Sequence, residues 1–245
     1  MDFFDYLNQL DKISFQTKVN KWNIFRSFLQ FVMEYYEDFL ITIPRYCVNW
    51  RPVHKKPVSN KDVVMTREDV KRILDYSYNY SYYYYLIFRL LAETGMRIGE
   101  FLGIDCEHLN VERRYVETED KTGRNIYYFS KGLADHLTLY MKERELKQNR
   151  CKALFLFVQG GRYTRRPINR YIRKTVSRVG IDKWISSHTF RNKINTLRKK
   201  MGCPRKDRKV LLWHKVSDVN YQCYVKLNYD DYIQLYDKWN PYKNI

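Results

Sequence analysis

The first regular pattern of apolar and polar positions lies near the N-terminus. From Ser14 to about Asp38, apolar residues recur every three or four positions, which predicts a helix with one apolar face. The next stretch, "IPRYCVNWRPVHKKPVSNKD" over residues 43–62, contains three prolines and several charges and is typical of a linker. We therefore expect a short helical module with its linker over residues 1–56 and a second domain over residues 57–245.

The second domain begins with two predicted helices. In "TREDVKRILDY", Thr66 is followed three residues later by Asp69, which resembles a capping box with an acidic side chain in place of the usual Glu or Gln. The run "YSYYYYLIFRLLAETG" predicts a helix that ends at Gly95, since glycine readily takes the left-handed conformation at a helix C-terminus. We interpret its tyrosines as the wall of a buried helix. A short helix is expected from Met96 to Gly103.

The period changes between residues 108 and 130. "RYVET" and "NIYYF" are rich in strand-forming residues, and "EDKTGR" between them has turn chemistry, so a hairpin is predicted, with a third strand near "HLNV". Helices are expected again at Leu133–Gln148, Asn169–Val179, Thr189–Met201, Lys206–Leu212 and Tyr229–Trp239. The predicted fold class is mainly α with a small antiparallel β-sheet (α+β).

The charge of the chain gives information about its binding partner. The chain has 45 Lys and Arg against 27 Asp and Glu, a net charge of +18 that exceeds what solubility requires. Interleaved aromatic residues favour nucleic acid as the partner over a merely solvated basic surface. The segment "GGRYTRRPINR" reads as a loop whose arginines contact DNA phosphates. These arginines are Arg162, Arg165, Arg166 and Arg170.

Cysteine and histidine patterns argue against a metal site. The five cysteines show no CxxC spacing and suit a reducing compartment, and the five histidines form no HExxH motif. We expect no metal and no cofactor. No apolar run approaches the roughly 18 residues of a membrane span, and the N-terminus lacks the features of a secretory signal. The expected location is the cytoplasm, at a prokaryotic nucleoid or in the host cell of a virus.

A scattered polar set suits displacement at a phosphodiester without a metal ion. Two arginines can neutralise the charge of the transition state, a histidine can accept the proton of an attacking tyrosine, and a lysine on a hairpin can protonate the leaving 5′ oxygen. The candidates are Arg97, Lys121, His188 and Arg191 in an HxxR pattern, His214, and the tyrosines Tyr221 and Tyr224.

Four segments, in order, resemble the conserved boxes of the tyrosine recombinase (phage integrase) family. They are "LLAETGMRIGEFLGIDCEHLN", "DKTGRNIYYF", "SSHTFRNKINT" and "LLWHKVSDVNYQCYVKL", and together they cover about residues 60–228. The resemblance implies catalytic roles for Arg97, Lys121, His188, Arg191, His214 and Tyr224, and a supporting role for Glu100. The family rhythm "SDVTxxxYxxL" favours Tyr224 as the nucleophile, with Tyr221 as the alternative.

The resemblance also implies a function. It predicts a site-specific DNA recombinase or integrase that cleaves and rejoins double-stranded DNA through a covalent 3′-phosphotyrosyl intermediate, without metal or ATP. The expected assembly is a homo-oligomer, a tetramer on paired DNA sites, that integrates a viral genome or another mobile element. The alternatives are an Xer-type resolvase, a type IB topoisomerase-like activity, and a non-catalytic DNA-binding protein of recombinase descent. Retention of all six polar positions favours an enzyme.

Some features depart from the family pattern. Asn192 replaces a common histidine, Trp213 replaces the usual glycine before His214, and the N-terminal module is shorter than the usual core-binding domain. The C-terminal segment places an apolar face at helical spacing through Tyr232, Leu235, Tyr236 and Trp239. That face needs a partner, which is either a neighbouring protomer on DNA or the helix's own subunit.

Overall fold

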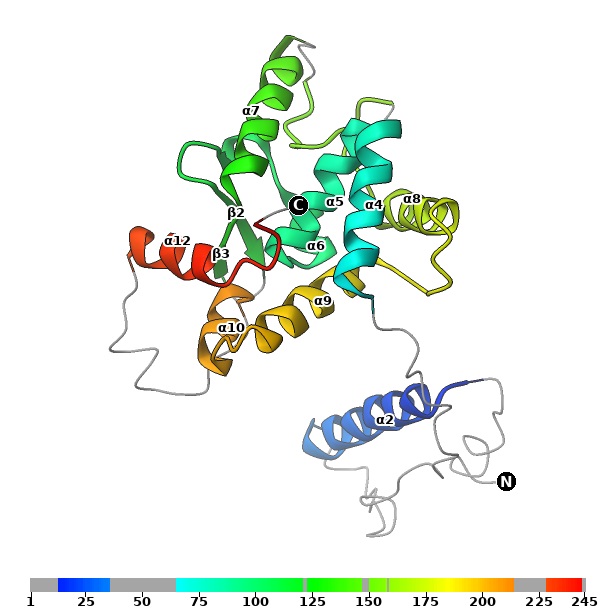
Figure 1. Cartoon of the computed structure of the whole chain (residues 1–245). Coiled ribbons are helices and arrows are strands. Elements are labelled where there is room, and N and C mark those ends of the chain that lie inside the picture. Colours follow the sequence, from blue (N-terminus) through cyan, green and yellow to red (C-terminus); the bar gives the residue numbers. More distant parts are fainter. Residues whose placement is uncertain are drawn as a thin grey trace. The chain divides into compact units, whose positions relative to one another are not determined.

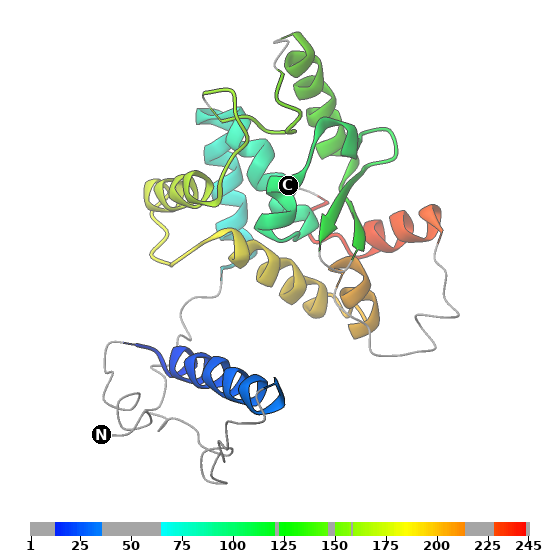
Figure 2. The same cartoon turned by 180° about the vertical axis from the view of Figure 1, so that it is seen from behind.

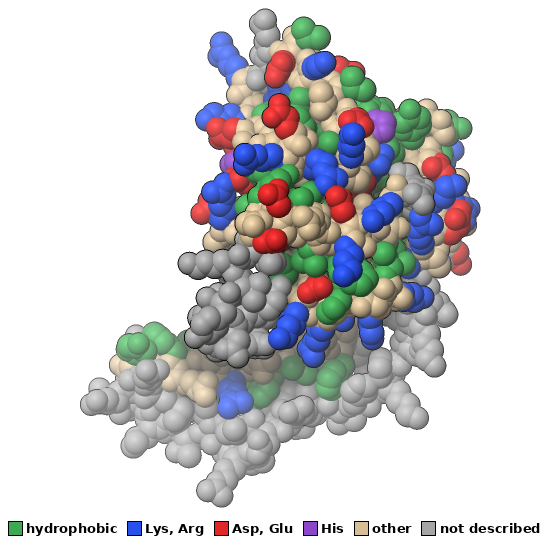
Figure 3. Space-filling view, turned by 60° about the vertical axis from the view of Figure 1, so that its left-hand side comes forward, with side chains coloured by type: hydrophobic (Ala, Val, Ile, Leu, Met, Phe, Trp, Pro, Cys, Tyr) green, Lys and Arg blue, Asp and Glu red, His purple; other side chains and the backbone are tan. Residues whose placement is uncertain are grey.

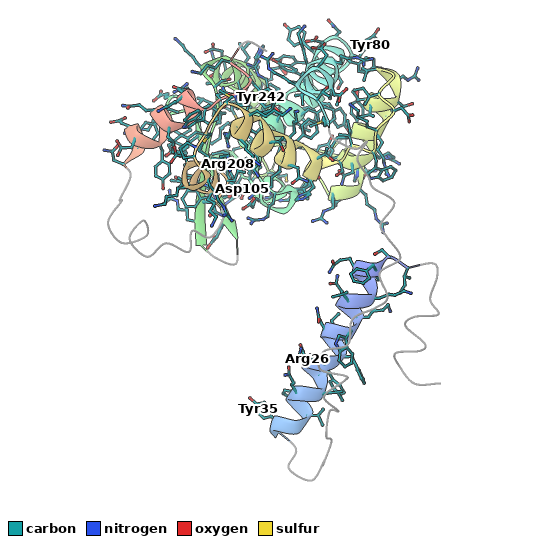
Figure 4. The ribbon with its side chains drawn as sticks, turned by 60° about the horizontal axis from the view of Figure 1, so that its bottom comes forward. Arg26, Tyr35, Tyr80, Asp105, Arg208 and Tyr242 are labelled. Atoms are coloured by element: carbon teal, nitrogen blue, oxygen red, sulfur yellow. The ribbon has the colours of Figure 1, made fainter. Side chains whose placement is uncertain are left out.

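A computed structural model describes residues 13–35, 65–120, 123–146, 150–157, 159–213 and 228–243. The chain divides into two compact units, Met1–Lys61 and Asp62–Ile245. In the first unit, helix α2, Phe15–Tyr35, confirms the predicted amphipathic helix (Figure 1). Trp22 is buried, whereas the side chains at Arg26 and Tyr35 project from the helix (Figure 4).

The second unit opens with the two predicted helices, α4 (Arg67–Tyr80) and α5 (Tyr82–Thr94). The capping box is confirmed: the Thr66 hydroxyl accepts a hydrogen bond from the Asp69 backbone N–H, and the Asp69 carboxylate accepts one from the Thr66 N–H. Helix α5 ends at Gly95, whose φ of 64° lies in the left-handed region.

The predicted hairpin and third strand are both present in a sheet of order β1-β2-β3. Strands β2 (Tyr115–Asp120) and β3 (Gly123–Tyr128) pair antiparallel, with Val116 opposite Tyr127 on the buried face. The short strand β1, Leu109–Asn110, follows the 3-10 helix η1, Cys106–His108, and pairs with β2. The mainly helical fold with a small antiparallel sheet is therefore confirmed.

Helix α5 is the centre of the second unit. Its residues Leu86, Ile87, Phe88 and Leu90 are fully buried, because α4, α7, α9 and strand β3 pack around it (Figures 1 and 2). The remaining helices are α6 (Ile98–Gly103), α7 (Lys131–Leu146), α8 (Arg165–Arg178), α9 (Ser187–Lys200), α10 (Arg205–Leu211) and α12 (Tyr229–Lys238).

The tyrosine run contributes to this packing, as the sequence interpretation expected. Tyr84 stacks on Tyr171 with ring centroids 3.4 Å apart, and the Tyr83 hydroxyl donates to the Leu156 carbonyl at 2.6 Å. Tyr85 is buried and its hydroxyl accepts from Arg89. Because these rings and hydroxyls are engaged within the fold, the run serves to attach α5 to its neighbours.

One predicted loop is wrong. The segment "GGRYTRRPINR" was expected to be irregular as far as Asn169, but α8 begins at Arg165. Pro167 is the third residue of this helix, where a backbone N–H has no partner within the helix, so the proline removes nothing there. The arginines from Arg165 onward therefore lie on a helix.

The C-terminal helix packs on its own unit, which supports the second of the two interpretations of its apolar face. Tyr236 is 1% exposed and its hydroxyl donates to Glu93 of α5 at 3.0 Å, while Asp237 pairs with both terminal nitrogens of Arg114. Tyr242, beyond the helix, is buried among the side chains of the second unit (Figure 4). Among the described residues, no helix is long and apolar enough to cross a membrane.

Candidate active site

Arg97 stands at the start of α6, two residues after the turn at Gly95. It is the N-cap residue of that helix, and its backbone N–H and guanidinium both donate to the Glu100 carboxylate, at 2.5 Å and 3.1 Å. The Arg97 side chain is 46% exposed, whereas the Glu100 side chain is 3% exposed. The buried carboxylate thus holds the guanidinium of an arginine whose side chain remains partly exposed.

Glu100 is itself held from the sheet. Asn125 of β3 donates to its carboxylate at 3.2 Å, and the Tyr127 hydroxyl lies 3.1 Å and 3.0 Å from its two oxygens. Burial, and then the charge of Glu100, raise the pKa of Tyr127 above the usual value for a tyrosine. The Tyr127 hydroxyl therefore stays protonated and serves as a hydrogen-bond donor.

Arg191 lies on α9 and is 4% exposed. Its two terminal nitrogens donate to the carbonyls of Gly95 at 2.6 Å and of Leu212 at 2.5 Å. These carbonyls belong to the ends of α5 and α10, so the guanidinium is fixed where three helices meet. A guanidinium has five N–H donors, and the two carbonyls use only part of this capacity.

His188 is exposed in the first turn of α9, one turn before Arg191. The N-terminus of α9 is ordered by Asn169, which accepts a hydrogen bond from the Ser187 N–H at 3.0 Å. His188 shares an open pocket of about 550 Å³ with Arg97, Glu100 and other residues. The others are Ile98, Gly99, Glu119, Arg165, Asn169, Ser186 and Ser187. The positive end of the α9 dipole adds to the basic side chains here, so the pocket favours an anion.

Four candidate residues, Lys121, His214, Tyr221 and Tyr224, lie outside the described residues. Their described neighbours are close to the pocket: Glu119 of β2 lines it, and the Leu212 carbonyl holds Arg191. The structure places Arg97, Glu100 and His188 around one pocket, with Arg191 one helical turn beyond His188. The placement of the other four stays a prediction.

Trp213 is one of the departures from the family pattern, and its contacts account for it. It replaces the usual glycine, and its φ of 50° is the left-handed conformation that glycine adopts most easily. The indole N–H donates to the Ile126 carbonyl at 2.7 Å, and the ring stacks on Tyr232 with centroids 6.2 Å apart. These contacts with β3 and α12 offset the cost of the conformation.

The predicted DNA-binding arginines separate into two kinds. Arg165 lines the pocket of Arg97 and His188, and it also lines a neighbouring pocket of about 810 Å³ together with Arg166 and Arg170. Arg162 instead donates to the carbonyls of Leu102 and Ile104 and pairs with Asp105. The contacts of Arg162 are those of a residue that holds a loop.

Two residues of this surface were missed by sequence reasoning. Arg173 and Trp184 line the same pocket as Arg166 and Arg170, and the Arg173 guanidinium lies 5.1 Å from the centre of the Trp184 ring. Arg166, Arg170 and Arg173 are spaced by four and three residues, which is one face of a helix and was a usable signal. Trp184 comes from a separate segment, and no local pattern indicated it.

Helix α8 carries six Arg and Lys residues and no Asp or Glu. By contrast, on the face shown in Figure 3, basic side chains are interspersed with acidic ones. Six basic charges along a helix of roughly 21 Å make a one-signed surface beside the pocket. In the described part of the chain, no group of three or more His, Cys, Asp and Glu residues could hold a metal ion.

Comparison with known proteins gives a consistent picture. A family model described as the phage integrase family matches residues 63–230. The chain is 28% identical over 160 residues to the tyrosine recombinase XerD of Lacticaseibacillus casei, a match that covers 63% of this chain and 54% of that protein. It is 25% identical over 224 residues to the tyrosine recombinase XerD of Staphylococcus epidermidis, covering 88% of this chain and 73% of the relative.

Among solved structures, the chain is similar to the integrase of the Tn1549 transposon in complex with circular intermediate DNA. The TM-score is 0.71 at 15% sequence identity, and the match covers 94% of this chain and 82% of that one. At this identity the likeness shows the fold. The matched part spans about half the length of the first relative above, so what these proteins do is not carried over to this chain by similarity alone.

Proposed function

The chain belongs to the phage integrase family, and we propose that it cleaves and rejoins DNA at specific sites through a covalent 3′-phosphotyrosyl intermediate. The observation that carries the proposal is the convergence of Arg97 and His188 on one open pocket, with Arg191 fixed one helical turn beyond His188. These residues come from segments about 90 positions apart in the chain.

The pocket suits the transition state of phosphoryl transfer. Charge on the equatorial oxygens is met by two guanidiniums and by the N-terminus of α9, without a metal ion. Arg191 is held by two backbone carbonyls and Arg97 by Glu100, so neither guanidinium has to reorganise as charge develops. Donors fixed before the reaction are those that lower the barrier most.

The covalent step is proposed for Tyr224, with Tyr221 as the alternative. The phenol oxygen attacks phosphorus, its proton passes to a base for which His214 is the candidate, and the P–O bond to the 5′ oxygen breaks. Lys121 is proposed to give that leaving oxygen its proton. One phosphodiester replaces another of similar energy, so rejoining needs neither ATP nor an oxidant.

The basic surface beside the pocket is proposed to hold the duplex. Arg165, Arg166, Arg170 and Arg173 meet phosphates along α8, and residues 1–56 add a small DNA-binding module. Arg162 counts as part of this surface only if its side chain also contacts DNA phosphates. Action on paired sites implies a homo-oligomer, proposed to be a tetramer, and the proposed setting is integration of a mobile element or viral genome.

Covalent trapping tests the chemistry. Nicked duplexes taken from the DNA that flanks the gene are incubated with the protein, and a denaturing gel is examined for a protein–DNA adduct. We expect an adduct with wild type and with Tyr221→Phe, and none with Tyr224→Phe. The reverse pattern would move the nucleophile to Tyr221. DNA binding without any adduct from wild type would leave a non-catalytic DNA-binding protein.

Salt dependence tests the surface. On duplex DNA, each phosphate contact adds roughly 0.9 to the slope of log affinity against log salt. Arg166→Ala and Arg173→Ala should each lower that slope by about one. Arg162→Ala is the informative partner variant, because its side chain binds Asp105 and two carbonyls. An unchanged slope for Arg162→Ala, beside lower thermal stability, would assign it to the fold.

A further inference from the structure

Tyr127 is buried against Glu100, the carboxylate that lines the pocket beside Arg97. It lies on β3, is 1% exposed, and its hydroxyl lies 3.1 Å and 3.0 Å from the two oxygens of Glu100. Glu100 in turn holds the Arg97 guanidinium at 3.1 Å. The charge of the Arg191 side chain also acts on the Tyr127 hydroxyl. A hydrogen-bonded relay therefore runs Arg97–Glu100–Tyr127, with Arg191 near its end.

The relay joins side chains from separate elements of the second unit. Arg97 begins α6, Arg191 lies in α9, and Tyr127 belongs to a strand that follows α6 by about twenty residues. The Gly95 and Leu212 carbonyls fix Arg191 at the ends of α5 and α10. Tyr127 adds a side-chain link between the region of Arg191 and the carboxylate that holds Arg97.

We propose that Tyr127 is a positioning residue that sets the spacing of the Arg97 and Arg191 guanidiniums around the scissile phosphate. This inference rests on the proposed function. The phenol ring is rigid and buried against the core, so its hydroxyl marks a fixed point. Its proton goes to Glu100, and the charge of Arg191 acts on the same hydroxyl. A phosphate bridged by two forks tolerates little error in their spacing, and a misplacement of about 1 Å can cost a hundredfold in rate.

Tyr140 is a buried tyrosine that does not share this arrangement. Tyr140 is 7% exposed and its hydroxyl donates to the Leu154 carbonyl at 2.8 Å, on a different side of the core. The Tyr127 hydroxyl donates to Glu100, which lines the pocket, whereas the Tyr140 hydroxyl contacts the Leu154 carbonyl and Tyr83, neither of which lines it. Tyr140→Phe is therefore a matched control for the loss of one buried hydroxyl.

The experiment compares Tyr127→Phe with Tyr140→Phe at saturating nicked DNA. Tyr127→Phe should slow adduct formation roughly ten- to a hundredfold while DNA affinity changes less than about twofold. Tyr140→Phe should cleave at the wild-type rate, and thermal unfolding shows that both variants are folded at the assay temperature. Equal cleavage by the two variants, or a parallel loss of affinity and rate, would overturn the positioning role.

A second variant tests the route through Glu100 and does not depend on the stability of Tyr127→Phe. Glu100→Gln keeps the shape of the side chain but weakens its link to Arg97. It should slow cleavage with affinity retained, and adding Tyr127→Phe should slow cleavage little further, because both changes break one relay. Fully multiplicative losses would reject the relay. If wild type itself forms no adduct, the proposed function fails, and the positioning role fails with it.

Discussion

Helix α9 buries two arginines, and they are held in opposite ways. Arg191 and Arg198 are seven residues apart, two turns along nearly the same face, and are 4% and 0% exposed. Arg191 donates to two carbonyls at 2.6 Å and 2.5 Å. Arg198 makes a 3.3 Å hydrogen bond to the Trp239 carbonyl and lies 5.9 Å from the centre of the Tyr236 ring, while one terminal nitrogen has no hydrogen-bond partner among the described residues.

This difference shows that burial of an arginine and its function are separate matters. Burial lowers the pKa of Arg198 to about 10, because its charge has left water without a carboxylate beside it. Arg191 is almost as deeply buried, but it belongs to the end of α9 that lies beside the pocket. A buried arginine is thus no mark of an active site by itself. Well-satisfied donors beside an open, basic pocket are the more informative sign.

The largest effect is expected at the end of α9 that carries Arg191. Arg191→Ala should slow adduct formation a hundredfold or more, because one preorganised guanidinium is removed from the charge that develops. DNA affinity should fall only a few fold, since α8 carries most of the proposed phosphate contacts. Rates are measured at saturating nicked DNA, and wild-type cleavage by Arg191→Ala would remove this residue from the active site.

Deleting residues 229–245 affects the other end of α9, where Arg198 lies. The deletion removes the buried Tyr236 and Tyr242 and takes the Trp239 carbonyl from Arg198. The free energy of unfolding should fall by roughly 3–5 kcal/mol or more, by analogy with a large buried aromatic side chain. Urea denaturation measures it. A truncated protein of normal stability that fails only to assemble on DNA would instead place the docking site of α12 on a neighbouring protomer.

A smaller effect is expected from a change that shifts Arg191 without replacing it. At Gly95, with its φ of 64°, an added Cβ would lie 2.7 Å from Ile194 and 2.8 Å from Leu212. Gly95→Ala should destabilise the fold by about 1–3 kcal/mol and slow cleavage, because the Gly95 carbonyl that holds Arg191 must shift. Gly103→Ala is the control, since an added Cβ there meets nothing within 4 Å. Equal stability of both variants would show that the close approach at Gly95 is relaxed.

The smallest effect is expected from Arg198→Met. This change removes a buried charge that has incomplete hydrogen bonding and leaves an unbranched apolar side chain that is shorter than arginine. Replacing buried ionic groups by apolar ones is often neutral or stabilising by about 1–4 kcal/mol. We expect unchanged cleavage and an unfolding free energy equal to or above that of wild type. A loss of several kcal/mol would mean that the contacts of Arg198 with Tyr236 and Trp239 outweigh its desolvation.

Apolar periodicity was sufficient to predict most elements, and it failed where other signals prevailed. The start of α8 was missed because Arg165, Arg166 and Pro167 have the composition of a loop, although Ile168 and Ile172 are four apart and both buried. The face of α12 was predicted, but spacing within one helix cannot tell which molecule covers it. That answer came from contacts with Glu93 and Arg198, distant in the chain.

The candidate site shows the same division. Motif order predicted that Arg97, His188 and Arg191 would come together, because each motif fixes its own residue and the family order fixes the rest. Tyr127 was not predicted: "NIYYF" indicates only a strand, and the value of its hydroxyl depends on Glu100, which lies 27 residues away in the chain. Trp184 was missed for the same reason, because its partner Arg173 belongs to another element.

The one-signed charge of α8 has a consequence for kinetics. At physiological salt, charge is felt over roughly 8 Å, so six basic residues with no acidic neighbour on the helix attract any duplex before close contact is made. Attraction of this kind accelerates encounter and lets a protein slide and hop along DNA. Under the proposed function, helix α8 would govern how fast the protein searches a genome, while the neighbouring pocket would govern whether a strand is cut when the search ends.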